Sequence, residues 1–334
     1  MDIAVFSPAE LPFVFAALAA AATGGAPPQA EDQRFLAACE TVLGTATVRT
    51  DADLITPATI ADGVRGTHAR KRLLQLAGIA ALVHRPVRAG SAAYLGALAQ
   101  ALGTRDPIVS VVDALARGRR GRARLLCMRR MLRVLVKEAY QSQGVRGVLR
   151  VFGALWFKLA VDKDQLWSHK RLGLLPEGTL GREYWSHMTR VGFGFPGERG
   201  GIPQVLAYHD VGHVLTGYST VPEGELQQGA FQAGCRREDG FVFLQFVVLQ
   251  FHQGLQLTPA AQAESGLLDP DRLLRALYRG SQCAVDITHR WSYWHLMPMP
   301  LGEVRTLLNL QPSASRRRPG QTVARPPALT AAAS

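Results

Sequence analysis

The segment His209-Asp210-Val211-Gly212-His213 places two imidazoles and a carboxylate within five consecutive residues. Pro203 before it and Gly217 after it are typical of helix boundaries, so we expect one short helix to carry the whole segment. At 100° per residue, the three polar side chains project at about 0°, 100° and 40° and share one arc of that helix. Histidines one turn apart are a known metal-binding device, although such a pair can also be two hydrogen-bonded core residues.

A second helix is expected shortly after the first, with Thr220 as its N-terminal cap and Pro222 in its first turn. Glu223, three residues after Thr220, fits a capping box and so has a structural role. Glu225 follows the second histidine after eleven intervening residues and is expected to face back toward the metal. Asp210 is predicted as a ligand or as a residue that orients one. The predicted metal ligands and catalytic residues are therefore His209, Asp210, His213 and Glu225, a nitrogen and oxygen set that suits Zn²⁺ without excluding iron or manganese.

The motif H-D-x-x-H is followed, after eleven intervening residues, by a glutamate. This pattern resembles the signature of the Coq-four family of coenzyme Q (ubiquinone) biosynthesis proteins. Upstream, the segment 175–184, which reads LPEGTLGREY, is similar to the family's L-P-x-G-T-x-G-x-x-Y segment. Downstream, the segment 300–305, which reads PLGEVR, is similar to its closing P-L-x-E-V-R helix. The resemblance covers residues 150–311. The stretch after Gly192 is shorter than in the family, and Gln232 stands near where an acidic residue is common.

This resemblance implies a ubiquinone biosynthesis enzyme, a metal-dependent (oxidative) decarboxylase, or lyase, that removes the ring carboxylate from a polyprenylated benzoate precursor, with or without hydroxylation of the ring. The implied partners are that precursor or another prenyl lipid, together with other ubiquinone-biosynthesis proteins. Two alternatives stay open. One is a non-catalytic carrier or scaffold that binds prenyl lipid, and the other is an HD-type metal phosphohydrolase, in which Asp286 would supply the downstream carboxylate.

The segment from Gly240 to Leu255 is apolar on almost every face, which predicts either a buried core helix or the wall of a prenyl-binding tunnel. Phe243 and Phe246 of this segment, with Tyr184 of the upstream motif, are the predicted substrate contacts.

The N-terminal part contains an internal echo, because FLAA at 35–38 leading to LGT at 43–45 recurs as YLGA at 94–97 leading to LGT at 102–104. Each copy follows an Ala- and Leu-rich stretch and a loop with proline, which indicates a duplicated helical hairpin. The pattern is similar to the TerB-like helical domain. We therefore predict an all-α chain with a hairpin domain at 1–140, a metal and prenyl-lipid domain at 141–311, and a disordered Pro- and Arg-containing tail at 312–334.

The chain is strongly basic, with a formal charge of +12 and a pI near 10.1, and nine Arg and Lys residues lie between Arg117 and Lys137. Apolar residues at helical spacing opposite these charges predict a basic amphipathic helix. It is either a solvated face of a core helix or a surface for anionic membrane; no nucleic-acid motif accompanies it, and nucleic acid is not an expected partner. Four separated cysteines and the lack of a signal-like N-terminus predict a cytoplasmic protein, peripheral on the inner membrane at most.

Overall fold

The computed structural model describes residues 1–3, 5–44, 56–152, 162–201, 204–258, 261–289 and 291–310. Over these ranges the chain is helical, and its β-structure amounts to two isolated bridges. The predicted all-α fold is therefore confirmed. The predicted tail at 312–334 lies outside the described residues.

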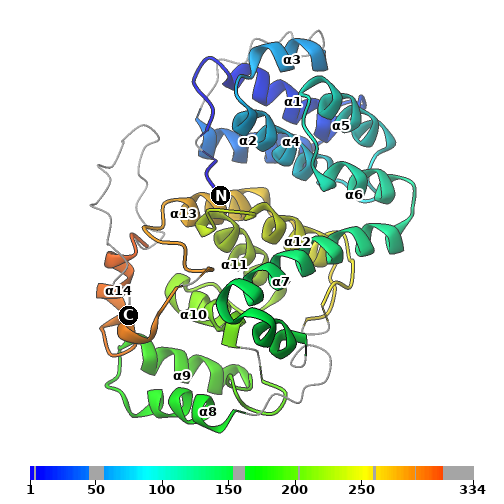
Figure 1. Ribbon diagram of the computed structural model, residues 1–334. Helices are drawn as coiled ribbons and strands as arrows, with labels where there is room; N and C mark the ends of the chain where they lie inside the picture. The colour runs from blue at the N-terminus through cyan, green and yellow to red at the C-terminus, as the bar shows by residue number, and fades with distance from the viewer. Residues whose placement is uncertain are drawn as a thin grey trace.

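Six helices make up the N-terminal part, which forms the upper half of Figure 1. The internal echo falls on the second and fifth of them, and each copy ends at a glycine with positive φ, Gly44 at 99° and Gly103 at 61°. Glycine is favoured where a helix ends in this backbone conformation. The helices are α1 (Leu11–Thr23), α2 (Ala30–Leu43), α3 (Pro57–Gly63), α4 (Thr67–Ala81), α5 (Ala89–Ala101) and α6 (Pro107–Ala116).

The C-terminal part begins with a long helix that runs beneath the N-terminal helices (Figure 1). Helices α10 and α11 lie at the centre of the C-terminal part, α13 lies on the side that faces the N-terminal part, and α8 and α9 lie at the end farthest from it. The helices are α7 (Arg120–Phe152), α8 (Lys163–Lys170), α9 (Leu180–Val191), α10 (Ala207–Thr216), α11 (Pro222–Cys235), α12 (Phe241–Phe251), α13 (Pro270–Ser281) and α14 (Leu301–Leu307).

Several helices begin where a short polar side chain can accept a hydrogen bond from the first turn, which satisfies a backbone donor that has no partner inside the helix. Thr56, Asp106, Asp162, Thr179 and Asp269 cap α3, α6, α8, α9 and α13 in this way. These caps explain from the sequence alone why the elements begin where they do.

One hydrophobic core runs through both parts of the chain. Helix α13 packs on α2, and the core includes residues from α1 and α4 as well as from α11 and α12. The four cysteines are buried thiols without disulfides. Helix α7 continues across residue 140, so the predicted division of the chain near that position stays a prediction.

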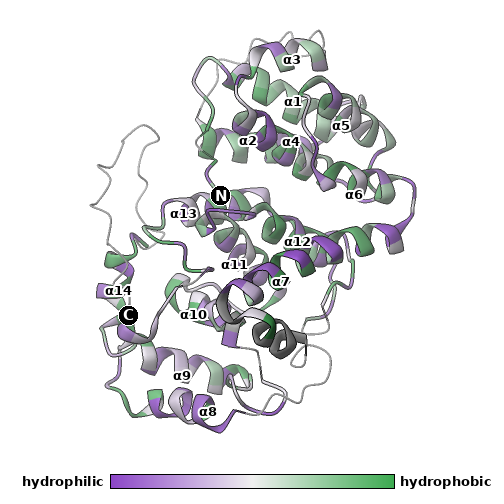
Figure 2. Cartoon of the chain, in the orientation of Figure 1, coloured by the Kyte–Doolittle hydropathy of each residue, from purple (hydrophilic) through white to green (hydrophobic). Residues whose placement is uncertain are grey.

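Helix α12 is buried along most of its length, while α7 alternates hydrophilic and hydrophobic residues (Figure 2). Burial on almost all sides is what a helix requires in water when nine of its eleven residues are apolar and only Gln245 and Gln250 are polar. None of the helices among the described residues has the length and apolar character needed to cross a bilayer.

Candidate metal centre

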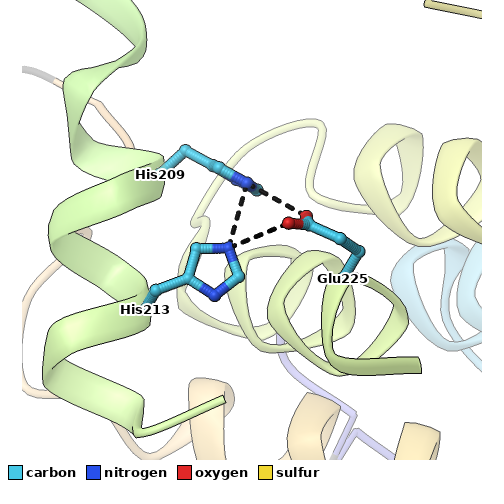
Figure 3. Close-up of side chains that lie close together, drawn as sticks. All are labelled: His209, His213 and Glu225. Carbon is cyan, nitrogen blue, oxygen red and sulfur yellow. Dashed lines mark hydrogen bonds and ion pairs between the residues drawn. The ribbon is translucent and has the colours of Figure 1, made fainter. Parts of the chain in front are cut away.

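Three side chains from two successive helices meet beside α10 (Figure 3). His209 and His213 lie one turn apart on α10, and their Nε2 atoms are 3.2 Å apart. Glu225, in the first turn of α11, places Oε2 3.1 Å from Nε2 of His209 and Oε1 3.3 Å from Nε2 of His213. One ligand atom from each residue lies within 4.8 Å of the other two, which is compact enough for all three to contact one ion. We call these three residues the triad.

Each histidine of the triad is oriented by a hydrogen bond from its other ring nitrogen. His213 Nδ1 donates to the carbonyl oxygen of Tyr218 at 3.0 Å, and His209 Nδ1 donates to Oε1 of Gln232 at 3.2 Å. Because Nδ1 of each ring is engaged in this way, Nε2 of each ring faces Glu225 and the other histidine. Such partners fix the ring orientation and raise the basicity of a metal-binding imidazole.

Opposite charges dominate the electrostatics of the triad. Burial alone would lower the pKa of His209, but the hydrogen bond and the charge of Glu225 raise that pKa to about 9. Burial alone would raise the pKa of Glu225, but hydrogen bonds from His209 and His213 lower it to about 2. Without metal, the triad therefore holds a proton between its imidazoles and its carboxylate, in the place where a cation is favoured.

Asp210 is the one predicted ligand that the structure does not bring into this group. Its side chain is 3% exposed, and its Oδ2 has no hydrogen-bond partner among the described residues. Burial raises the pKa of this carboxyl. A buried carboxylate oxygen without a partner is costly, so Asp210 has the capacity to accept a further donor or a cation next to the triad.

Glu223, the competing glutamate, is exposed and does not contact the histidines. The predicted capping box at Thr220 and Glu223 is wrong, because α11 begins with Val221 at the N-cap and no side chain caps it. The chain turns closely here instead: a Cβ on Gly224 would lie 2.0 Å from the carbonyl oxygen of Ser219. Only glycine permits this tight approach, in the same first turn of α11 that carries Glu225.

Sequence reasoning missed His187, on α9. Its ring stacks on that of His213, with centroids 5.8 Å apart and planes inclined by 16°. Burial and the neighbouring His213 lower the pKa of His187 to about 4, and its buried Nε2 has no hydrogen-bond partner among the described residues. In the sequence, the one feature that could have indicated a role for His187 was its position one helical turn after Tyr184, on the same face of α9.

The three predicted substrate residues do not lie together. Tyr184 is fully buried on α9, packed edge to face on Phe195 with ring centroids 6.3 Å apart, and no described residue pairs with its hydroxyl. Phe243 and Phe246 on α12 instead pack against a small cluster that contains Met131 and Val134 of α7. These two phenylalanines belong to the contact between α12 and α7.

The motifs before and after the triad are joined to each other by backbone hydrogen bonds. Leu180 and Gly181 donate to the carbonyl oxygens of Met299 and Met297, at 2.9 and 2.8 Å, and Leu301 donates back to Gly178 at 2.8 Å. A Cβ on Gly181 would lie 3.0 Å from the Met297 carbonyl, so glycine permits this pairing.

The downstream motif also contacts the helix of the histidines. Arg305 donates from Nε to Leu215 and from Nη2 to Val214, whose carbonyls lie in the last turn of α10. A glycine again permits close packing on the other side of this helix. A Cβ on Gly212 would lie 2.1 Å from Nε2 of Gln228, the side chain through which α11 packs on α10.

No protein-family model matches the chain, and the search of curated proteins gives no match. Among solved structures, the chain is similar to a protein of Nostoc punctiforme that is provisionally described as a ubiquinone biosynthesis protein, with 20% identity and a TM-score of 0.33. That match covers 60% of this chain and 94% of the other. At this identity and TM-score it does not decide function. The TerB-like resemblance of the N-terminal part has no support among the comparisons.

Proposed function

We propose that the chain is a metal-dependent enzyme of ubiquinone biosynthesis that removes the ring carboxylate from a polyprenylated benzoate precursor. The observation that carries this proposal is the convergence of the triad, in which His209, His213 and Glu225 face one point and both imidazoles are already oriented. The ordered upstream and downstream motifs, which the structure joins by hydrogen bonds, support it.

The triad would hold a divalent ion, with Zn²⁺ the best fit to two imidazoles and a carboxylate, and Asp210 is proposed as a further ligand or orienting group. A bound divalent cation supplies charge that binds a carboxylate and stabilises negative charge developing in the transition state. These ligands fit this role because none of them is a thiolate and because they carry one negative charge, from Glu225, or two when Asp210 is counted.

Around the triad, several buried polar atoms have unused hydrogen-bonding capacity. These are Oδ2 of Asp210, Nε2 of His187, the hydroxyl of Tyr184 and Nε2 of Gln232. We propose that they bind the ring substituents of the substrate and supply the proton that replaces the carboxylate. In that reaction the ring carbon keeps the electron pair of the broken carbon–carbon bond, carbon dioxide leaves, and the carbon accepts a proton.

The test is turnover by metal-loaded protein of a 4-hydroxybenzoate with a short prenyl chain and a ¹³C-labelled carboxylate. We expect labelled carbon dioxide and a product that has lost the carboxylate, with no turnover by His213→Ala. If folded protein with bound metal releases no labelled carbon dioxide above background, the enzyme proposal is wrong.

A carrier or scaffold is the second candidate, because Glu225 ties α11 to α10 and a metal there would also fix two helices. It is favoured if purified protein retains prenyl lipid by mass spectrometry yet gives no turnover. The HD-type phosphohydrolase has no such support. Asp286 accepts instead from the backbone nitrogen of Arg237 at 2.9 Å and from Thr288, outside the triad.

A further inference from the structure

A cavity of about 390 Å³ lies between the N-terminal and C-terminal parts of the chain, outside the triad. Residues of α4 form one wall, residues of α7 form another, and the turn between α11 and α12 closes a third side. A cavity of this volume holds several water molecules, so it is large enough for a small organic or inorganic ligand. We call this space the interdomain cavity.

Five cationic residues line the interdomain cavity, against two acidic residues, Glu238 and Asp239, and the guanidinium of one of the five, Arg237, donates to the carbonyl oxygen of Cys283 at 2.7 Å. Lys137 pairs with Glu238 at 3.2 Å, and Arg130 is paired behind the cavity with Asp106 at 2.8 Å. No carboxylate of the described residues lies within ion-pair distance of the Lys71 ammonium. The cations are Lys71, Arg72, Arg130, Lys137 and Arg237.

Arg72 is the most informative of these cations, because it is 8% exposed and its Nε has no hydrogen-bond partner within the described part of the chain. Its Nη1 donates to Oε1 of Gln75 at 2.7 Å, and Gln75 Nε2 donates to Oδ2 of Asp106 at 2.9 Å. This chain of hydrogen bonds holds the guanidinium in one orientation. A buried guanidinium with a free donor is costly unless an acceptor reaches it, although Asp2 also favours its charge.

We propose that the interdomain cavity binds a small soluble anion that carries one or two phosphate groups. Arg72 and Lys71 have free donor capacity, and phosphate oxygens accept from guanidinium and ammonium groups at once. Arg72 would supply the oriented donor and Lys71, at the exposed edge, a point charge. This site is independent of the proposed decarboxylase, because none of its residues belongs to the triad or to the residues around it.

A ligand in this position would contact both parts of the chain, since Lys71 and Arg72 belong to α4 whereas Arg237 follows α11. Binding to the folded chain alone stabilises it by mass action. Ligand binding should therefore raise the unfolding temperature as well as give a direct binding signal.

The test is calorimetric titration of the full chain with inorganic pyrophosphate, first at low salt and then at physiological salt. We expect saturable binding that weakens as salt increases, and a dissociation constant raised about tenfold or more in Lys71→Glu, since this change replaces attraction by repulsion. Arg72→Lys keeps the charge but loses the planar donor and should also bind more weakly. Lys163→Glu, at an exposed lysine of α8, is the matched control and should bind like the parent.

Lys71 is exposed and α4 does not depend on it for packing, so Lys71→Glu is expected to fold, as its helical circular dichroism will show. The proposal is overturned if pyrophosphate gives no saturable heat below about 10 mM. It is equally overturned if Lys163→Glu weakens binding as much as Lys71→Glu, or if chloride at the same ionic strength binds as tightly as pyrophosphate.

Discussion

Arg305 donates from Nε to the carbonyl oxygen of Leu215 at 2.9 Å, at the end of the helix that carries both histidines of the triad. A cation in this position satisfies backbone acceptors that have no partner inside the helix and interacts favourably with the helix dipole. Arg305→Ala is therefore expected to lower the free energy of unfolding by about 1 to 3 kcal/mol, as measured by urea titration. Arg275→Ala, which removes an exposed pair with Asp271, should change it by less than about 1 kcal/mol. Equal losses in the two variants would contradict the role given to Arg305.

The histidine pair is expected to be required for metal binding, because His209 and His213 provide both nitrogen ligands from one helix. His213→Ala should purify with little metal, and the parent should hold about one ion per chain. Elemental analysis after dialysis measures this, and circular dichroism confirms folding. Full metal content in folded His213→Ala would refute the site.

Two glutamates close together in the sequence provide a sharper comparison. Glu225 contacts both histidines, whereas Glu223 is exposed. Glu225→Gln keeps the shape but removes the ligand charge, so metal affinity should fall about 10-fold or more. Glu223→Gln should leave metal affinity unchanged and alter stability by less than about 0.5 kcal/mol, because it has no capping partner. Competition with a fluorescent zinc chelator measures the metal affinity of both variants. A loss of affinity in Glu223→Gln but not in Glu225→Gln would exchange the two roles.

The triad was accessible from the sequence because its parts depend on local geometry. Helical periodicity places His209 and His213 on one face of α10, and only the short connection between α10 and α11 separates them from the helix of Glu225. The capping box at Thr220 was predicted wrongly, because α11 has Val221 at its N-cap and Gly224 lies close against Ser219, a contact that no local pattern reveals.

Features that depend on which helices pack together were beyond sequence reasoning. His187 reaches His213 only because α9 packs against α10. The orientation of Phe243 and Phe246 could not be read either, because a helix that is apolar on every side has no preferred face in its sequence. In the structure both pack against the small cluster with Met131 and Val134 of α7 as well as against the main core.

Helix α7 is expected to bring the protein to anionic membrane surfaces. It exposes Leu125 and Met128, at 57% and 37%, beside the exposed Arg124 and Arg129. Each such charge contributes about 1 kcal/mol near an anionic surface. The parent should float with anionic liposomes and not with neutral ones, and the double variant Arg124→Glu and Arg129→Glu should bind at least about tenfold more weakly.

The matched control for this flotation is a double reversal of exposed arginines on another helix, Arg272→Glu with Arg275→Glu on α13. It changes the net charge by the same amount but leaves α7 intact. Equal flotation of the parent with neutral and anionic liposomes would reject the prediction, as would an equal loss in the control.

His252 predicts how stability responds to acid. Its ring is 6% exposed; Nε2 donates to the carbonyl oxygen of Val83 at 2.9 Å, while Nδ1 accepts from the backbone of Leu268 at 3.3 Å. This arrangement suits the neutral imidazole, because a proton on Nδ1 would face another donor. Burial, with the nearby charges of Arg85 and His84, lowers the pKa of His252 from 6.5 despite the hydrogen bond to Val83.

The sign of the effect follows from this lowered pKa. Just below pH 6.5 the unfolded chain binds a proton at His252 that the folded chain does not, so the free energy of unfolding falls as the pH falls through this window. One such group contributes a slope of at most about 1.4 kcal/mol per pH unit, and above pH 6.5 its contribution is constant. His252→Gln should be less stable than the parent at pH 8, because Gln cannot reproduce both hydrogen bonds, but its stability should fall less steeply between pH 6.5 and 5. Urea titrations at half-unit pH intervals measure both slopes, and parallel curves for the two proteins would show that His252 is not the group that titrates.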